Sequence, residues 1–148
     1  MNVAANNYIP SHVFRYVERE LYDYPINRQT VDSYLENRET ILTGIRQLLA
    51  DGTSRPEGTI SDVTYTKTMR LLVEAERAER AMFYVQAIDS VMAVLGEGER
   101  LLVQRKYFEA DKKTDQAIAD ELNVSKATFY RVRQEVVRKF ALRFGLLW

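Results

Sequence analysis

The stretch that most constrains the fold is residues 114–140, TDQAIADELNVSKATFYRVRQEVVRKF. Thr114 and Ser125 are residue types that cap helix starts, because a hydroxyl oxygen there accepts a free backbone N–H. Asn123 lies between two helical segments, and after Gly it is the residue that best tolerates the positive φ of a tight turn. The stretch therefore predicts a helix-turn-helix.

The spacing of apolar residues supports the same prediction. Ile118, Ala119 and Leu122 fall on one face of the first helix, and the small Ala119 lets a second helix approach closely at a steep angle. Val124 is expected to plug the turn. The second helix carries an apolar stripe: Phe129, Val132, Val136 and Phe140. We expect this second helix to protrude, as a recognition helix does into a DNA major groove.

The chain has no net charge, but its bases gather near the C-terminal end. From Asn123 onward there are six bases and a single acid, Glu135. Concentrated positive charge is what binding to DNA phosphates requires. The alternative interpretation is an amphipathic helix with a solvated basic face in an ordinary helical bundle.

Candidate DNA contacts follow from this geometry. Arg can pair with guanine and Gln with adenine through two hydrogen bonds each, so the second helix offers direct base readout. The residues expected at base edges are Lys126, Ala127, Tyr130, Arg131 and Gln134. The residues expected at phosphates are Thr114, Gln116, Ser125, Thr128, Arg133 and Arg138. One small domain gives limited affinity, so we expect a homodimer or higher oligomer that binds paired half-sites in double-stranded DNA.

Helix signals dominate the rest of the chain, so we predict an all-α fold. Tyr24-Pro25 should end the first helix, since a residue before proline disfavours the helical conformation. Residues 51–60 form a linker with two glycines and a proline. The long helix that follows shows no regular heptad. The expected helices ahead of the helix-turn-helix span residues 11–24, 27–50, 62–95 and 99–108.

These elements group into three predicted parts. An N-terminal helical hairpin and its linker occupy residues 1–60. A long connecting helix, which is a candidate for oligomerisation, occupies residues 61–97. The helix-turn-helix domain occupies residues 98–148.

Composition argues against catalysis and against a membrane protein. There is no Cys and only one His, His12, so neither a zinc site nor a Cys–His pair is available. We expect no catalytic residues, no cofactor and no metal site. No apolar stretch approaches membrane-spanning length, and the first residues lack the pattern of a secretory signal. We therefore expect a cytoplasmic protein.

The C-terminal half resembles region 4 of bacterial sigma-70 factors. Ile118-Ala119, Leu122, Val124-Ser125 and Thr128 match the motif IA-x-x-L-x-V-S-x-x-T of that region. The whole chain resembles the ArpU/RinA/LtrC-type regulators of phage and prophage late genes, whose first helix ends in a segment like residues 20–25, ELYDYP. The resemblance implies a DNA-binding activator of packaging and morphogenesis genes that acts with the RNA polymerase of a bacterial host.

Two other functions remain open at this point. A phage terminase small subunit also joins a helix-turn-helix to helical oligomerisation elements, and it would bind a packaging site and form rings. A helical interaction protein with no DNA function would show no salt-dependent DNA binding.

Overall fold

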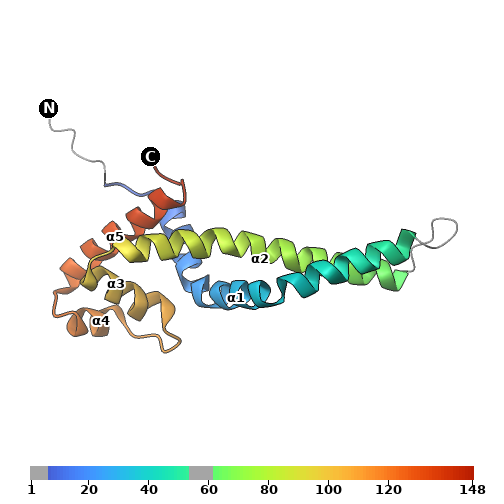
Figure 1. Ribbon diagram of the computed structural model, residues 1–148. Coiled ribbons are helices and arrows are strands. Elements are labelled where there is room, and N and C mark those ends of the chain that lie inside the picture. Colours follow the sequence, from blue (N-terminus) through green and yellow to red (C-terminus); the bar gives the residue numbers. More distant parts are fainter. Residues whose placement is uncertain (1–6, 54–61) are drawn as a thin grey trace. The chain divides into compact units, whose positions relative to one another are not determined.

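The computed structural model describes residues 7–53 and 62–148, and side chains from residue 7 to 50 and from 65 onward (Figure 1). All regular structure in these residues is helical, which confirms the predicted all-α class. The elements are α1 (Ser11–Thr53), α2 (Asp62–Val94), α3 (Glu97–Val103), the π-helical turn η1 (Gln104–Phe108), α4 (Asp115–Glu121) and α5 (Lys126–Arg143).

The chain divides into two compact units rather than into the three predicted parts. Unit 1 comprises the residues up to Pro25 together with residues 84–148, and unit 2 comprises residues 26–83. Both α1 and α2 contribute to both units. Most of the predicted linker at 51–60 lies outside the described residues, although α1 extends into its first part, to Thr53.

The predicted end of the first helix at Tyr24-Pro25 is wrong, because α1 continues through Pro25. A proline inside a helix removes one backbone hydrogen bond and costs about 3 kcal/mol. Packing before and after it offsets this cost. The Tyr24 ring stacks on Phe108 with ring centroids 4.4 Å apart, its hydroxyl donates to Asp89, and Val31 is buried two turns later. The two expected N-terminal helices are therefore one.

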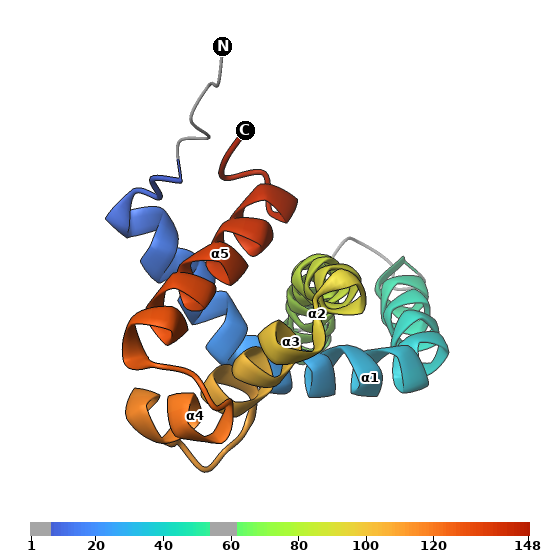
Figure 2. The same ribbon diagram turned by 90° about the vertical axis from the view of Figure 1, so that its left-hand side faces the viewer.

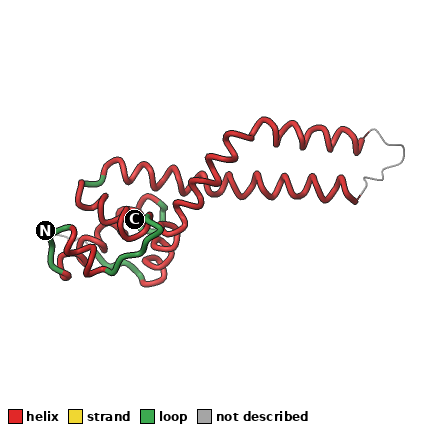
Figure 3. The backbone as a smooth tube through the Cα atoms, turned by 90° about the horizontal axis from the view of Figure 1, so that it is seen from below, coloured by secondary structure: helices red, strands yellow, loops and turns green. Residues whose placement is uncertain are grey.

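Unit 2 is a hairpin made by α1 and α2 instead of by two N-terminal helices. The two helices run side by side in opposite directions (Figures 1 and 3). The Tyr34 hydroxyl donates to Glu79 Oε1 at 3.2 Å, and Gly44 faces Leu71. The buried hydrophobic residues of this unit are Val31, Tyr34, Ile45, Ala78 and Ala81.

Unit 1 closes its core with residues from both ends of the chain. The first part of α1 crosses α5 (Figure 2), and Val17 and Leu21 of α1 are fully buried in one cluster with Leu102 and Phe129. Ile88 near the end of α2 belongs to the same cluster. The predicted domain 98–148 is therefore completed by residues far from it in the sequence.

The joint between α2 and α3 is fixed by an arginine side chain. Arg100 Nε donates to the Met92 carbonyl at 3.1 Å, and its Nη2 donates to the Leu95 carbonyl at 3.0 Å. These bonds satisfy carbonyls that the end of a helix leaves free. Gly98 lies within α3, so Gly96 is the glycine that marks the joint.

Polar contacts hold α1 against the π-helical turn. Tyr107 is fully buried, its hydroxyl donates to Glu18 Oε2 at 2.6 Å, and its ring packs edge-on against Tyr22. Burial raises the pKa of Tyr107 well above its usual range, with the Glu18 contact acting in the same direction. Tyr107 therefore stays neutral and serves as a hydrogen-bond donor that aligns α1.

Candidate nucleic-acid interface

The turn between α4 and α5 has the predicted left-handed residue. Asn123 has φ of 61°, and it is the only residue other than glycine with a positive φ in the described part of the chain. The Asn123 N–H donates to the Asp120 carbonyl at 3.1 Å, and the Val124 N–H donates to the Ala119 carbonyl at 3.0 Å. This left-handed cap satisfies the last carbonyls of α4 and redirects the chain into α5.

Both predicted helix caps are confirmed. Thr114 Oγ1 accepts from the Ala117 N–H at 3.1 Å, and Ser125 Oγ accepts from the Thr128 N–H at 3.1 Å. Ser125 Oγ also donates to Thr128 Oγ1 at 2.9 Å. Thr114 and Ser125 are both exposed, so α4 and α5 each begin at the surface.

The predicted apolar faces of α4 and α5 pack against the core as expected. On α5 the buried residues cover a wider arc of the helix than the predicted apolar stripe. Ile118 and Ala119 of α4 are fully buried, while Leu122 and Val124 are partly buried against the core. The fully buried residues of α5 are Phe129, Val136, Val137, Phe140 and Ala141. Because all of these belong to the core cluster, α5 can expose only the arc opposite to them.

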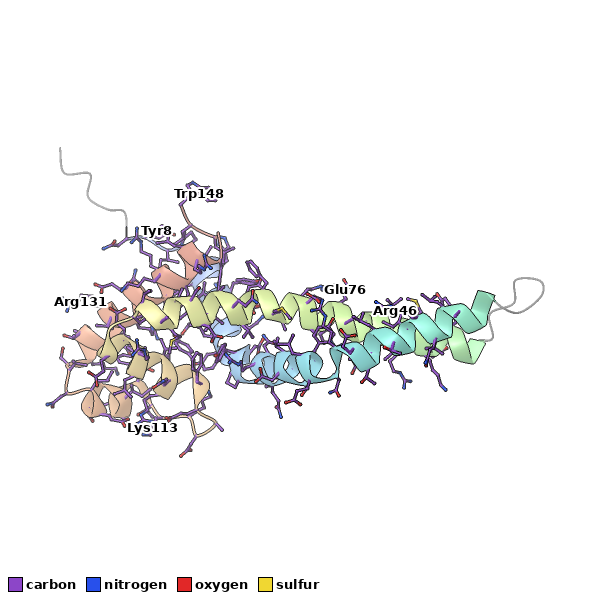
Figure 4. All side chains as sticks on the ribbon, in the orientation of Figure 1. Tyr8, Arg46, Glu76, Lys113, Arg131 and Trp148 are labelled. Carbon is purple, nitrogen blue, oxygen red and sulfur yellow. The ribbon has the colours of Figure 1, made fainter. Side chains whose placement is uncertain are left out.

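A single exposed stripe runs along that opposite arc of α5. Ala127, Arg131, Gln134 and Arg138 follow one another at helical spacing. The first three are exposed and Arg138 is half-buried. Arg131 lies at the outer edge of unit 1 (Figure 4). We call these four residues the α5 stripe.

Lys126 and Tyr130 flank the N-terminal end of the α5 stripe. The Tyr130 ring is 40% exposed, and the Lys126 Nζ lies 5.8 Å from its centroid. A cation held over an aromatic face keeps its charge while the apolar part of the side chain is covered. The two side chains therefore offer one positive charge and one apolar ring next to Arg131.

The positive charges on this face have no acidic partner, whereas Lys139 has one. No ion pair joins Lys126, Arg131 or Arg138 to an acid within residues 7–50 and 65–148. Lys139, on another side of α5, has its Nζ 2.8 Å from Glu99 Oε2, and Arg143 Nε donates to Ser90 Oγ at 3.0 Å. Arg131 and Arg138 therefore keep unpaired positive charge on the α5 stripe, and Lys126 keeps it beside the stripe.

Arg133 lies away from the stripe, although the sequence analysis grouped it with the phosphate contacts. Its guanidinium lies 5.2 Å from the centroids of both Phe14 and Tyr130, and its Nη1 lies 3.7 Å from Asp115 Oδ2. The Arg133 Nε atom is buried and has no hydrogen-bond partner. This side chain therefore links α5 to α1 and to the start of α4.

Asn7, which the sequence analysis missed, lies against the α5 stripe. The Asn7 carbonyl accepts from Gln134 Nε2 at 3.3 Å. Asn7, Arg131, Gln134, Glu135 and Arg138 together line a shallow cavity of about 180 Å³. The two segments are 127 residues apart, so no local pattern could have indicated this contact.

Ion pairs fix α4 beside η1. Lys106 Nζ lies 2.7 Å from Asp115 Oδ1, and Glu121 lies 3.0 Å from Arg105 Nε and 3.2 Å from Lys113 Nζ. The hydrogen bond from Lys113 and the charge of Arg105 hold the pKa of Glu121 below its usual range. Gln116, expected at a phosphate, donates to Asp120 Oδ1 at 2.9 Å and remains exposed.

No protein-family model, curated protein or solved structure matches this chain. Among the described residues, no group of His, Asp and Glu side chains is arranged to hold a metal ion. In the same residues, no helix has the length and apolar character needed to cross a membrane.

Proposed function

We propose that this protein is a sequence-specific DNA-binding transcriptional regulator with α5 as its recognition helix. The observation that carries the proposal is a set of cations without an acidic partner, the exposed Lys126 and Arg131 and the half-buried Arg138, on a helix that follows a capped left-handed turn. DNA binding requires such a concentration of charge on a protruding helix. Resemblance to the ArpU/RinA/LtrC-type regulators suggests activation of phage late genes with a bacterial host polymerase.

The stripe supplies both kinds of contact that a recognition helix makes. Arg131 and Gln134 carry the side chains suited to guanine and adenine edges, and Tyr130 offers an apolar surface to a thymine methyl group. Arg138 and the helix starts at Thr114 and Ser125 are suited to phosphates. Gln134 Nε2 already donates to the Asn7 carbonyl, and its second N–H and its amide oxygen remain for a base edge.

The test of the proposal is selection of bound fragments from the source genome by the purified full-length chain at two salt concentrations. Enrichment upstream of a late operon that weakens with salt is the expected result. Enrichment at a packaging site would instead indicate a terminase small subunit. The absence of any salt-dependent enrichment would contradict a DNA function.

Arg131→Ala tests base readout on the selected fragment. We expect affinity for that fragment to fall by about 1–3 kcal/mol, with a smaller loss on random DNA. Arg70→Ala is the matched control, because Arg70 is an exposed arginine of unit 2 and its loss changes the net charge equally. An equal loss on selected and random DNA would assign Arg131 to a phosphate.

A further inference from the structure

Unit 2 leaves large hydrophobic side chains uncovered. Its buried residues include only three large ones, Val31, Tyr34 and Ile45, among those described. Seven others are between 41% and 58% exposed: Leu35, Leu49, Tyr65, Met69, Leu72, Val73 and Phe83. Two paired helices bury one face of each against the other, so a second apolar face remains open to a partner.

On α1 the apolar residues follow a heptad. A spacing of four and three residues is the pattern of helices that pack in bundles. The residues at this spacing are Val31, Leu35, Arg38, Leu42, Ile45 and Leu49. Only one charged residue, Arg38, occupies the pattern, and it is exposed.

On α2 the same spacing of four and three residues is present, but some of its positions are not apolar. The residues at this spacing are Tyr65, Thr68, Leu72, Ala75, Glu79 and Met82. Three of the six positions, Thr68, Ala75 and Glu79, carry small or polar side chains, so the heptad is not visible from hydrophobicity alone. Its single charged member is Glu79.

The register of the hairpin aligns the two heptads. The contacts of Tyr34 with Glu79 and of Gly44 with Leu71 put Leu42 level with Leu72. By the same register, Leu49 is level with Tyr65. Successive residues of a helix are about 100° apart around its axis. On both α1 and α2, the heptad residues are therefore rotated in the same sense away from the residues that form the α1–α2 contact. In an antiparallel pair this places them on the same side of the hairpin.

The opposite side of the hairpin carries more polar side chains. Ser33, Asn37 and Glu74 line a depression of about 370 Å³ there, together with the apolar Ile41 and Ala78. The exposed leucines Leu35, Leu49 and Leu72 lie on the side of the two heptads, the heptad side, so that side is the one suited to burial.

We propose that the heptad side of unit 2 binds a second copy of itself, so that two hairpins form a four-helix bundle. Each half-exposed side chain of this size presents on the order of 100 Å². The four that belong to the heptads, Leu35, Leu49, Tyr65 and Leu72, present roughly 400 Å² per copy, about half of the roughly 800 Å² per partner of a stable interface, and the residues that flank them supply the rest. The proposal specifies the self-association expected of a regulator that binds paired half-sites, and it is tested without DNA.

The charges of Arg38 and Glu79 favour one arrangement of the two copies over another. If α1 packs on the partner's α2 about a two-fold axis parallel to the helices, Arg38 lies about one helical turn from the partner's Glu79 in both halves of the dimer. If α1 packs on the partner's α1, the arginines of the two copies meet instead. A single buried polar pair of this kind fixes register and partner in helical bundles.

Sedimentation equilibrium of the full-length chain is the first test. The wild-type chain should be a dimer, and Leu42→Glu or Leu72→Glu should raise the dimer Kd by about 100-fold, since the symmetric dimer loses two buried leucines. Ser33→Glu is the matched control on the polar side and should leave the Kd unchanged. Helix content measured by circular dichroism verifies that each variant is folded. A monomeric wild-type chain, or apolar variants that dimerise normally, would overturn the proposal.

Mixing two charge variants tests the arrangement directly. Arg38→Glu and Glu79→Arg should each weaken the homodimer. An equimolar mixture should form a heterodimer more tightly than either variant dimerises alone, because both contacts between copies regain opposite charges. A mixture that associates no better than its components would refute the α1-on-α2 arrangement. Neither result depends on DNA, so failure here is distinguishable from failure of the proposed DNA function.

Discussion

Asn123→Val probes the turn on which the recognition helix depends. At φ of 61° an ordinary L-residue costs about 1–2 kcal/mol, and a β-branched residue is at the upper end of that range. Relaxing the turn would not avoid the cost. Relaxation would break the Val124 to Ala119 hydrogen bond, worth about 1 kcal/mol, and would expose the partly buried Val124. We therefore expect the turn to persist under strain.

The expected effect is a loss of about 2 kcal/mol in the free energy of unfolding. For a chain near this length, that corresponds to a fall in Tm of roughly 4–8 °C. Thermal unfolding followed by circular dichroism measures it. Asn123→Gly is the control, because glycine adopts this conformation freely and should keep the free energy of unfolding within about 1 kcal/mol of the wild-type value. If the valine variant melted with the wild type, the positive φ would not be a requirement of the fold.

Two further predictions concern unit 1. Thr114→Ala and Ser125→Ala should each lower the free energy of unfolding by about 1 kcal/mol, because each removes the oxygen that accepts an N–H at a helix start. Chemical denaturation measures this loss. If neither variant lost stability, the capping geometry would be contradicted. Glu20 is buried, and burial raises its pKa above 4.5, so the folded state holds this proton more tightly than the unfolded state. Stability from this group is therefore present at low pH and is lost as the pH rises through the raised pKa. Glu20→Gln should accordingly melt higher than wild type at neutral pH, with the difference closing toward pH 4, and parallel pH profiles would refute this reasoning.

The sequence by itself determined the elements whose causes are local. Thr114, Asn123 and Ser125 act on backbone groups within three or four residues, so their roles could be predicted from residue type and spacing. The all-α class followed in the same way from helical periodicity.

The tertiary structure decided whatever depends on partners distant in the sequence. Pro25 should end a helix by the local rule, but packing of Tyr24 on Phe108 keeps α1 continuous. Arg131 and Arg133 are alike as residues, and only the positions of Phe14 and Asp115 make one a free cation and the other an internal link.

The tertiary structure also decided the register between α1 and α2. Thr68, Ala75 and Glu79 conceal the heptad in α2, and the contact between Tyr34 and Glu79 reveals it by aligning the two helices. Local interactions join residues that are close together in the sequence, so residue type and spacing predict them. Packing joins residues that only the folded chain brings together, so its consequences appear only in three dimensions.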